Sequence, residues 1–308
     1  MQTVSMEREV MARELRRATF WGCATRWYAT IYTFDGARSP HLMNEVWRLR
    51  EASFKRAGVS LDGDVKGNHA DVDGSCRQLI VWDNALGCIV GGYRYTVCAT
   101  MSPERLALAR YYRLSSRFIR GYMPHSLELG RSFVSPDYQC ASGRKTIYAL
   151  DALWEGLGRV VAALGVRYLF GRVTLYPAMS DGARDLLLGF MRYVFPSRVS
   201  LLRAHESLDV GLNRYRCRHI FVGETLADNY RILLSRMRDL DCAIPPIISS
   251  YMRLSPTMQT FDAYANHDLG GVVESAIMLT VSDFYDDIKR RYLSHSMVRH
   301  DAMTQAVM

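Results

Sequence analysis

The run HSLELGRSFV, residues 125–134, places an acid and a base inside a strand-like segment that is otherwise mostly apolar. A carboxylate in such a segment can act as a general base, and an arginine can bind a carboxylate through two hydrogen bonds. Glu128 and Arg131 are three residues apart, so the two faces of a regular strand would separate them. Two charges in a half-buried strand are costly unless they are paired, solvated or required for binding or catalysis. Two interpretations stay open: an edge strand with one charge on each exposed flank, or a bulged strand beside a ligand cleft.

The segment after this run predicts the helix and strand that would hold it in place. Residues 144–165 carry apolar side chains at helical spacing and end at Gly165, and residues 166–175 read as a buried strand. A strand–helix–strand crossover places its two strands side by side and parallel. The expected apolar stripe of the helix consists of Ile147, Leu150, Leu153, Trp154, Leu157, Val160, Val161 and Leu164.

The rest of the chain predicts a mixed sheet with helices on both faces. The segments 76–83 and 88–98 flank NALG, which is typical of a hairpin. A strand over 27–36 precedes a helix over 39–58, with Ser39 as N-cap and Pro40 at its first position. A long Gly/Asp-rich loop (59–75), a helix (180–196), a helix near 225–240, a turn (244–256), a strand (272–281) and a polar helix-like tail complete the expected elements. No repeat or linker marks a boundary between domains.

Composition narrows the class of protein. The 308 residues are 49% hydrophobic and 23% charged, which is typical of a globular chain with a sizeable core. The net charge of +8 favours an acidic partner, but no Lys/Arg block with interleaved aromatics indicates nucleic acid. The apolar runs are too short for a membrane span, and the N-terminus lacks the apolar core of a secretory leader. Seven cysteines without a C-x-x-C pair argue against a disulfide framework or a zinc site, and for a reducing cytoplasm.

Four stretches resemble one enzyme family: RLREASF, QLIVWDNALGCIVGGYRY, ELGRSFVSPDYQ and IPPIISSYMRLSPTM. The chain resembles the N-acyltransferase (GNAT) superfamily, and within it the hemolysin-like branch of ornithine-lipid and glycine-lipid N-acyltransferases. It looks most like the glycine-lipid synthases of Bacteroidetes-type bacteria, and more distantly like acyl-homoserine-lactone synthases. The resemblance implies an α/β GNAT-like fold, with a mixed, mainly antiparallel central sheet, helices on both faces and a C-terminal extension. It divides the chain into an N-terminal helix (1–26), an acyltransferase core (27–200) and a part that completes the same domain (201–308).

The family pattern carries over residue by residue. Its catalytic motif matches Glu128 and Arg131, together with Arg94 on the strand after the Gly-Gly pair. Glu128 would be the general base, or it would form a salt bridge with Arg94 or Arg131 that shapes the cleft. An acidic pair of the family corresponds to Asp71 and Asp73, which stand here at a different spacing. The residues implied to bind the acyl donor are Arg50, Phe54, Ser132, Phe133, Val134, Gln139, Gly143 and Arg144.

The same comparison implies the substrates. Ser142 and Arg144 stand where coenzyme A-binding acetyltransferases carry two glycines, which disfavours a pyrophosphate site. We therefore expect acyl carrier protein, with its phosphopantetheine arm, as the donor rather than coenzyme A. The acyl group would be fatty, with a 3-hydroxyl, and the acceptor an amino acid, glycine or ornithine. We expect no metal and no tightly bound cofactor. The alternative is a non-catalytic module that binds acyl groups or their carrier.

A final expectation concerns location. The enzyme would be cytoplasmic and could touch an anionic membrane peripherally. The N-terminal segment MEREVMARELRRATFW is a candidate contact, because Met6, Val10, Leu15 and Trp21 form an imperfect apolar stripe beside three arginines. The alternative is a solvated helix that packs on the core by that stripe.

Overall fold

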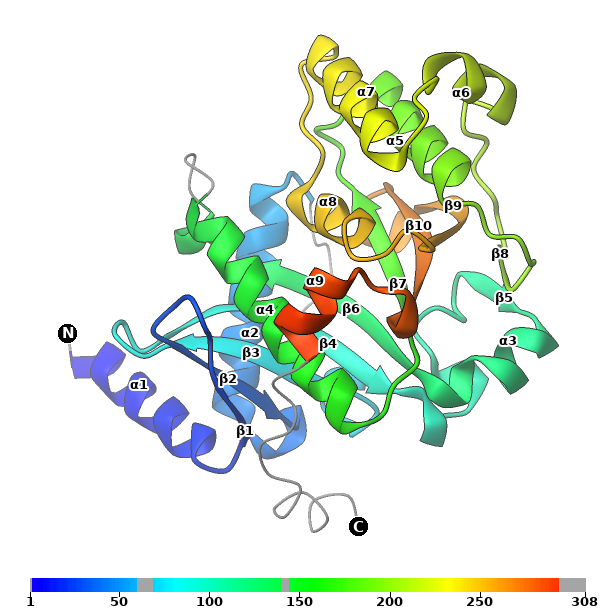
Figure 1. Ribbon diagram of the computed structural model, residues 1–308. Coiled ribbons are helices and arrows are strands. Elements are labelled where there is room, and N and C mark those ends of the chain that lie inside the picture. Colours follow the sequence, from blue (N-terminus) through cyan, green and yellow to red (C-terminus); the bar gives the residue numbers. More distant parts are fainter. Residues whose placement is uncertain (1, 60–68, 140–143, 294–308) are drawn as a thin grey trace.

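A computed structural model describes residues 2–59, 69–139 and 144–293 (Figure 1). Its main feature is an eight-stranded sheet in the order β1-β2-β3-β4-β6-β7-β10-β9. The strands are β1 (Thr19–Cys23), β2 (Ala29–Phe34), β3 (Arg77–Asp83), β4 (Cys88–Val97), β6 (Ser126–Val134), β7 (Tyr168–Leu175), β9 (Gln259–Asn266) and β10 (Val272–Thr280). Neighbours are antiparallel except β6 and β7, which are parallel as the crossover predicted. A small second sheet pairs β5 (Tyr112–Leu114) with β8 (Leu202–Ala204).

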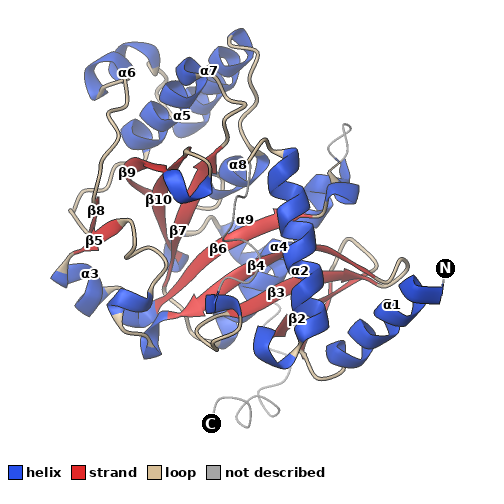
Figure 2. Cartoon of the chain, turned by 180° about the vertical axis from the view of Figure 1, so that it is seen from behind, coloured by secondary structure: helices blue, strands red, loops and turns tan. Residues whose placement is uncertain are grey.

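Helices cover both faces of the large sheet. They are needed because successive apolar side chains of a strand point to opposite faces, and both sets are buried. On β3, Leu79 and Val81 pack toward α4 (Arg144–Ala163), whereas Ile80 and Trp82 pack toward α2 (Pro40–Arg56). Seen from the front, α4 crosses the sheet, and seen from behind, α2 does so (Figures 1 and 2). The remaining helices are α1 (Gln2–Leu15), α3 (Ser116–Gly121), α5 (Asp181–Val194), α6 (Arg214–Ile220), α7 (Leu226–Asp239), α8 (Pro246–Met252) and α9 (Asp286–Ile288).

Several expected elements need correction. The N-terminal helix ends at Leu15 rather than near residue 26, because residues Thr19–Cys23 form edge strand β1. Strand β9 was missed, and the expected turn over residues 244–256 contains α8, which begins at a proline. Ile147 and Leu164, at the two ends of the expected stripe on α4, are exposed rather than buried.

The last third of the chain joins the same sheet as the first two thirds. Strand β10 lies between β7 and β9 and pairs with both. After α9, the chain packs back on α4, where the Tyr292 hydroxyl donates to Asp151 at 2.7 Å. The structure therefore has one continuous sheet across the expected boundaries at residues 26 and 200.

Candidate active site

The two parallel strands at the centre of the sheet separate partway along their length. Strand β6 pairs with β7 only from Ser126–Tyr168 to Leu129–Gly171. Beyond this point the register between β4 and β6 shifts, and Arg131 takes a positive φ of 52°. A left-handed residue at a register shift is the mark of a bulge. Strand β6 is therefore a bulged central strand, and the edge-strand interpretation is wrong.

Two adjacent glycines on β4 let the strands approach each other at this bulge. A Cβ atom at Gly91 would lie 2.6 Å from the carbonyl oxygen of Phe133. A Cβ atom at Gly92 would lie 2.8 Å from the carbonyl oxygen of Leu79. Neither distance is sterically allowed, so Gly91 permits the close approach of β6 to β4, and Gly92 permits that of β3 on the other side.

A cavity of about 480 Å³ lies where the strands separate, with residues of both α2 and α4 in its walls. This volume is within the range of sites that bind small molecules. The walls come from the end of α2, the bulged part of β6, the start of α4 and the start of α8, and they are mostly apolar. They include Ser53, Phe54, Arg56, Tyr93, Ser132, Phe133, Val134, Gln139, Thr146, Leu150, Leu153, Tyr176 and residues 245–247.

Five of the residues expected to bind the acyl donor line this cavity: Phe54, Ser132, Phe133, Val134 and Gln139. Side chains hold the carbonyl of Val134 at the end of β6. It accepts hydrogen bonds from Ser53 Oγ at 2.8 Å and from Gln139 Nε2 at 2.6 Å. These side chains hold the end of β6 away from β7 and so keep the cavity open.

The other expected donor residues lie elsewhere. Arg50 is buried and does not line the cavity: its guanidinium donates to Asp71 Oδ2 and to Gln78 Oε1, both at 3.0 Å. Arg144 is the exposed first residue of α4. Gly143 lies outside the described residues, as do Cys140 and Ser142.

Asp71 is a structural anchor, whereas Asp73 lies at the surface. Burial would raise the pKa of Asp71, but the charges of Arg50 and Arg94 and hydrogen bonds from Trp47 and Gln78 outweigh it, so the pKa is lowered. Asp73 accepts from Arg105 at 3.0 Å. The two aspartates therefore do not act as a pair.

A cluster of arginines surrounds the bulge. Arg94 is buried, and its Nη1 lies 3.7 Å from Asp71 Oδ1 without a hydrogen-bond partner among the described residues. Burial, with the charges of Arg94, Arg50 and Arg172, lowers the pKa of Arg131 to about 10. Within the described part of the chain, Arg131 forms no ion pair with a carboxylate. The cluster thus has positive charge in excess at Arg131.

Glu128 is buried and oriented by backbone amides. Its Oε1 accepts from Leu108 N at 2.7 Å and its Oε2 from Ala107 N at 3.0 Å. Burial raises its pKa, against the opposing effects of Arg172, the two amides and Arg94. No salt bridge of hydrogen-bonding length joins Glu128 to Arg94 or Arg131 among the described residues. A carboxylate with a raised pKa, held among arginines, can accept a proton.

Sequence reasoning missed three groups that the fold brings to this region. Arg172 on β7 donates to Glu274 on β10 at 2.9 Å and is one of the charges that act on Glu128. Tyr93 and Tyr176 line the cavity. Burial and the neighbouring Tyr251 raise the pKa of Tyr93, and burial and Glu274 raise the pKa of Tyr176 to about 12. Of these three, only Tyr93 had a signal in the sequence. It precedes Arg94 on the same predicted strand, so its side chain must point to the opposite face of the sheet.

Comparison with known proteins defines the class and then the family. Residues 49–149 match the family model described as an acetyltransferase (GNAT) domain, so the molecule is an acyltransferase with the mixed α/β GNAT fold. The chain is 34% identical over 281 residues to a glycine N(alpha)-acyltransferase of Bacteroides thetaiotaomicron, covering 88% of this chain and 82% of the relative. It is 31% identical over 303 residues to a glycine N(alpha)-acyltransferase of Phocaeicola vulgatus, covering 96% and 93%. The chain therefore belongs to the family of glycine N(alpha)-acyltransferases, which confirms the resemblance.

One solved structure also aligns with most of the chain. FeeM, an N-acyl amino acid synthase from uncultured soil microbes, aligns with a TM-score of 0.44 and 8% identity, covering 88% of this chain and 98% of its own. Among the described residues, no three His, Cys, Asp or Glu side chains form a group that could hold a metal ion. None of the helices in the described ranges has the length and hydropathy needed to span a bilayer.

Proposed function

We propose that this N-acyltransferase moves a 3-hydroxy fatty acyl group from acyl carrier protein to the α-amine of glycine. Ornithine is the alternative acceptor. The observation that carries the proposal is the bulge on β6. It places Ser132 on the wall of an apolar cavity, and the preceding Arg131 in a cluster with excess positive charge. One side of the bulge suits an acyl chain, and the other suits a small carboxylate.

The donor would enter the cavity with its acyl chain against Phe54, Phe133 and Leu153. The phosphodiester of the phosphopantetheine arm would lie near the start of α4, where Arg144 is exposed. Backbone amides of the bulged segment, Ser132 to Val134, would stabilise the oxyanion of the tetrahedral intermediate. The names of the curated relatives support glycine as the acceptor.

The acceptor would bind with its carboxylate on Arg131, assisted by Arg94, because a guanidinium binds a carboxylate through two parallel hydrogen bonds. An amino acid's amine is mostly protonated at neutral pH and cannot attack in that form. Glu128 would take its proton, and the free amine would attack the thioester carbonyl. The C–N bond forms, the C–S bond breaks, and the pantetheine sulfur leaves as the thiol. We place the reaction in the cytoplasm, in line with the free cysteines of the described chain.

The test is an assay with purified protein. The 3-hydroxyacyl and the unsubstituted acyl thioesters of carrier protein are each incubated with glycine, ornithine or serine, and products are identified by mass spectrometry. N-acylglycine formed from the 3-hydroxyacyl donor supports the proposal. Product with ornithine alone would move the acceptor assignment to ornithine. A lack of any N-acylated amino acid with every donor and acceptor would overturn the proposal.

A further inference from the structure

The helices α6 and α7, with the connections around them, form a cap at the end of the molecule farthest from β1 (Figures 1 and 2). We call residues 214–240 the cap. Its inner side is firmly packed on α5: the ring of Phe221 lies 5.0 Å from that of Phe190, and Leu233 and Met237 of α7 are buried. A capping box between Thr225 and Asp228 fixes the start of α7. The cap is therefore an ordered part of the fold.

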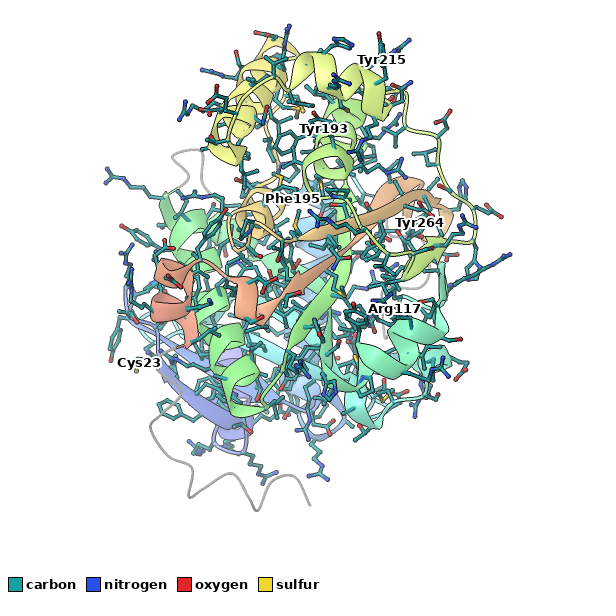
Figure 3. All side chains as sticks on the ribbon, turned by 45° about the vertical axis from the view of Figure 1, so that its right-hand side comes forward. Cys23, Arg117, Tyr193, Phe195, Tyr215 and Tyr264 are labelled. Atoms are coloured by element: carbon teal, nitrogen blue, oxygen red, sulfur yellow. The ribbon has the colours of Figure 1, made fainter. Side chains whose placement is uncertain are left out.

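The cap exposes four large apolar side chains. Tyr215 and Val222 are each 71% exposed. Leu234 and Leu240 are exposed too. Figure 3 shows Tyr215 at the outer end of the molecule, pointing away from its body. Single exposed apolar residues are ordinary, but four within one short segment call for a partner that covers them.

Arginines surround these apolar groups. All six arginines of the cap are exposed, against three carboxylates, which leaves a net charge of +3 on 27 of the 308 residues. Of the six, only Arg231 forms an ion pair with a described carboxylate, that of Asp228 at 3.0 Å. The arginines are Arg214, Arg216, Arg218, Arg231, Arg236 and Arg238.

We infer that the outer side of the cap binds the surface of an anionic lipid bilayer. Protruding tyrosine and aliphatic side chains reach the boundary between headgroups and acyl chains, while arginines stay at the level of the phosphates. Each basic residue near an anionic surface adds to the attraction, so the exposed arginines of the cap favour reversible binding. We favour a bilayer over an acidic protein because exposed apolar side chains and arginines share this segment, and a bilayer surface offers both acyl chains and phosphates.

The N-terminal segment, where the sequence suggested a membrane contact, is occupied within the molecule instead. Leu15 is buried, and the carboxylate of Glu14 accepts hydrogen bonds from the amides of His41 and Leu42 at the start of α2. Trp21 belongs to β1 and donates to Thr33 at 2.8 Å. Leu15 and Trp21 thus hold α1 and β1 to the core, and the cap is the better candidate for the contact.

Co-sedimentation of the full chain with vesicles tests this inference. The protein should bind vesicles of mixed phosphatidylglycerol and phosphatidylcholine, should not bind pure phosphatidylcholine, and should dissociate at high salt. The double variant R214E/R218E should lose at least about 10-fold in partition coefficient, since two attractions become two repulsions. The matched control R113E/R203E changes the same charge at an exposed cross-strand pair of β5 and β8, and should bind like the parent.

A second measurement reports insertion rather than charge. Tyr215→Trp should show a blue shift of its added fluorescence with anionic vesicles, measured against the parent protein, and this shift should disappear in the R214E/R218E background. Thermal melting of each variant verifies the fold. Equal losses in the two double variants, an absent blue shift, or equally tight binding to random-sequence DNA would each overturn the inference. These assays need no acyl transfer, so they stand apart from the proposed reaction.

Discussion

Glu128 lies where burial, two amides and several arginines act on one carboxylate. If it accepts the proton of the acceptor's ammonium, Glu128→Gln removes the base, and turnover should fall by about 100-fold or more. Steady-state rates, corrected for the folded fraction from thermal melting, measure this. The control is Glu155→Gln, which should leave turnover near normal. Glu155 is also buried, and it accepts a hydrogen bond from a backbone amide, Thr25 N at 2.9 Å. Normal turnover per folded Glu128→Gln molecule would make Glu128 purely structural.

The ionisation of Glu128 should also determine how the reaction rate depends on pH. A general base must be ionised, and burial raises the pKa of Glu128 above its ordinary value of 4.5. The rate should therefore fall as pH decreases through this raised pKa, and the acidic limb of the kcat/KM profile should lie above pH 4.5. An acidic limb at or below that pH would contradict the assignment.

Arg131 should determine affinity for the acceptor and leave affinity for the donor unchanged. We expect Arg131→Met to raise KM for glycine by about 10-fold or more, because a hydrogen bond to a charged group contributes roughly 1.5–3 kcal/mol. Arg131→Lys, which retains the charge, should recover part of the loss. Glycinamide, which lacks the carboxylate, should be used equally by the parent and by Arg131→Met. A rise in donor KM alone would place Arg131 on the donor side instead.

At the scale of elements, α2 is fastened to the sheet by the buried group of Arg50, Asp71 and Gln78. Removing one partner leaves an uncompensated buried charge, so Arg50→Met or Asp71→Asn should each cost roughly 3–5 kcal/mol of unfolding free energy. The double variant should cost less than the two single changes added together. Denaturant unfolding measures all three.

The lowered pKa of Asp71 gives this anchor a defined pH window. A carboxylate whose pKa is lower in the folded state stabilises the fold above its unfolded value, near 3.8, and loses this effect as pH falls through the folded value. The stability difference between the parent and Asp71→Asn should therefore be full at neutral pH and shrink below pH 3.8. A difference that grows on acidification would contradict this assignment.

The elements with strong local patterns were predictable from the sequence, and the others were not. The β3–β4 hairpin, α2, α4 and the β6–α4–β7 crossover follow from turn residues and hydrophobic periodicity. Strand β1 was missed because it is short and follows the basic helical run RELRR, and β9 because Asp262 and Asn266 interrupt its apolar character. The motif on β6 located the cavity, but Arg172 and Tyr176 reach the site from later segments through long-range pairing, which no local pattern encodes.

At the scale of the whole molecule, donor choice follows from the charge at the cavity mouth. A carrier-bound donor presents one phosphodiester and an acidic protein surface, whereas coenzyme A presents a pyrophosphate. Arg56 lines the cavity, and the exposed Arg144 begins α4, whose residues Thr146, Leu150 and Leu153 also line it. The two positions that hold a pyrophosphate in glycine-rich loops are Ser142 and Arg144. We expect kcat/KM to be at least about 10-fold higher for the carrier thioester than for the coenzyme A thioester of the same chain. Equal values for the two donors would reject this preference.

The position of β10 has a consequence for how the protein is made. Strand β7 receives its second neighbour only when residues 272–280 have left the ribosome, almost a hundred residues after β7 itself. Until then, YLFGRVTL forms an open sheet edge rich in apolar side chains, a template on which two nascent chains can pair. Translation that stops before residue 272 should therefore yield aggregates rather than a smaller folded acyltransferase. The final third of the chain therefore completes the sheet and also covers the exposed edge of β7.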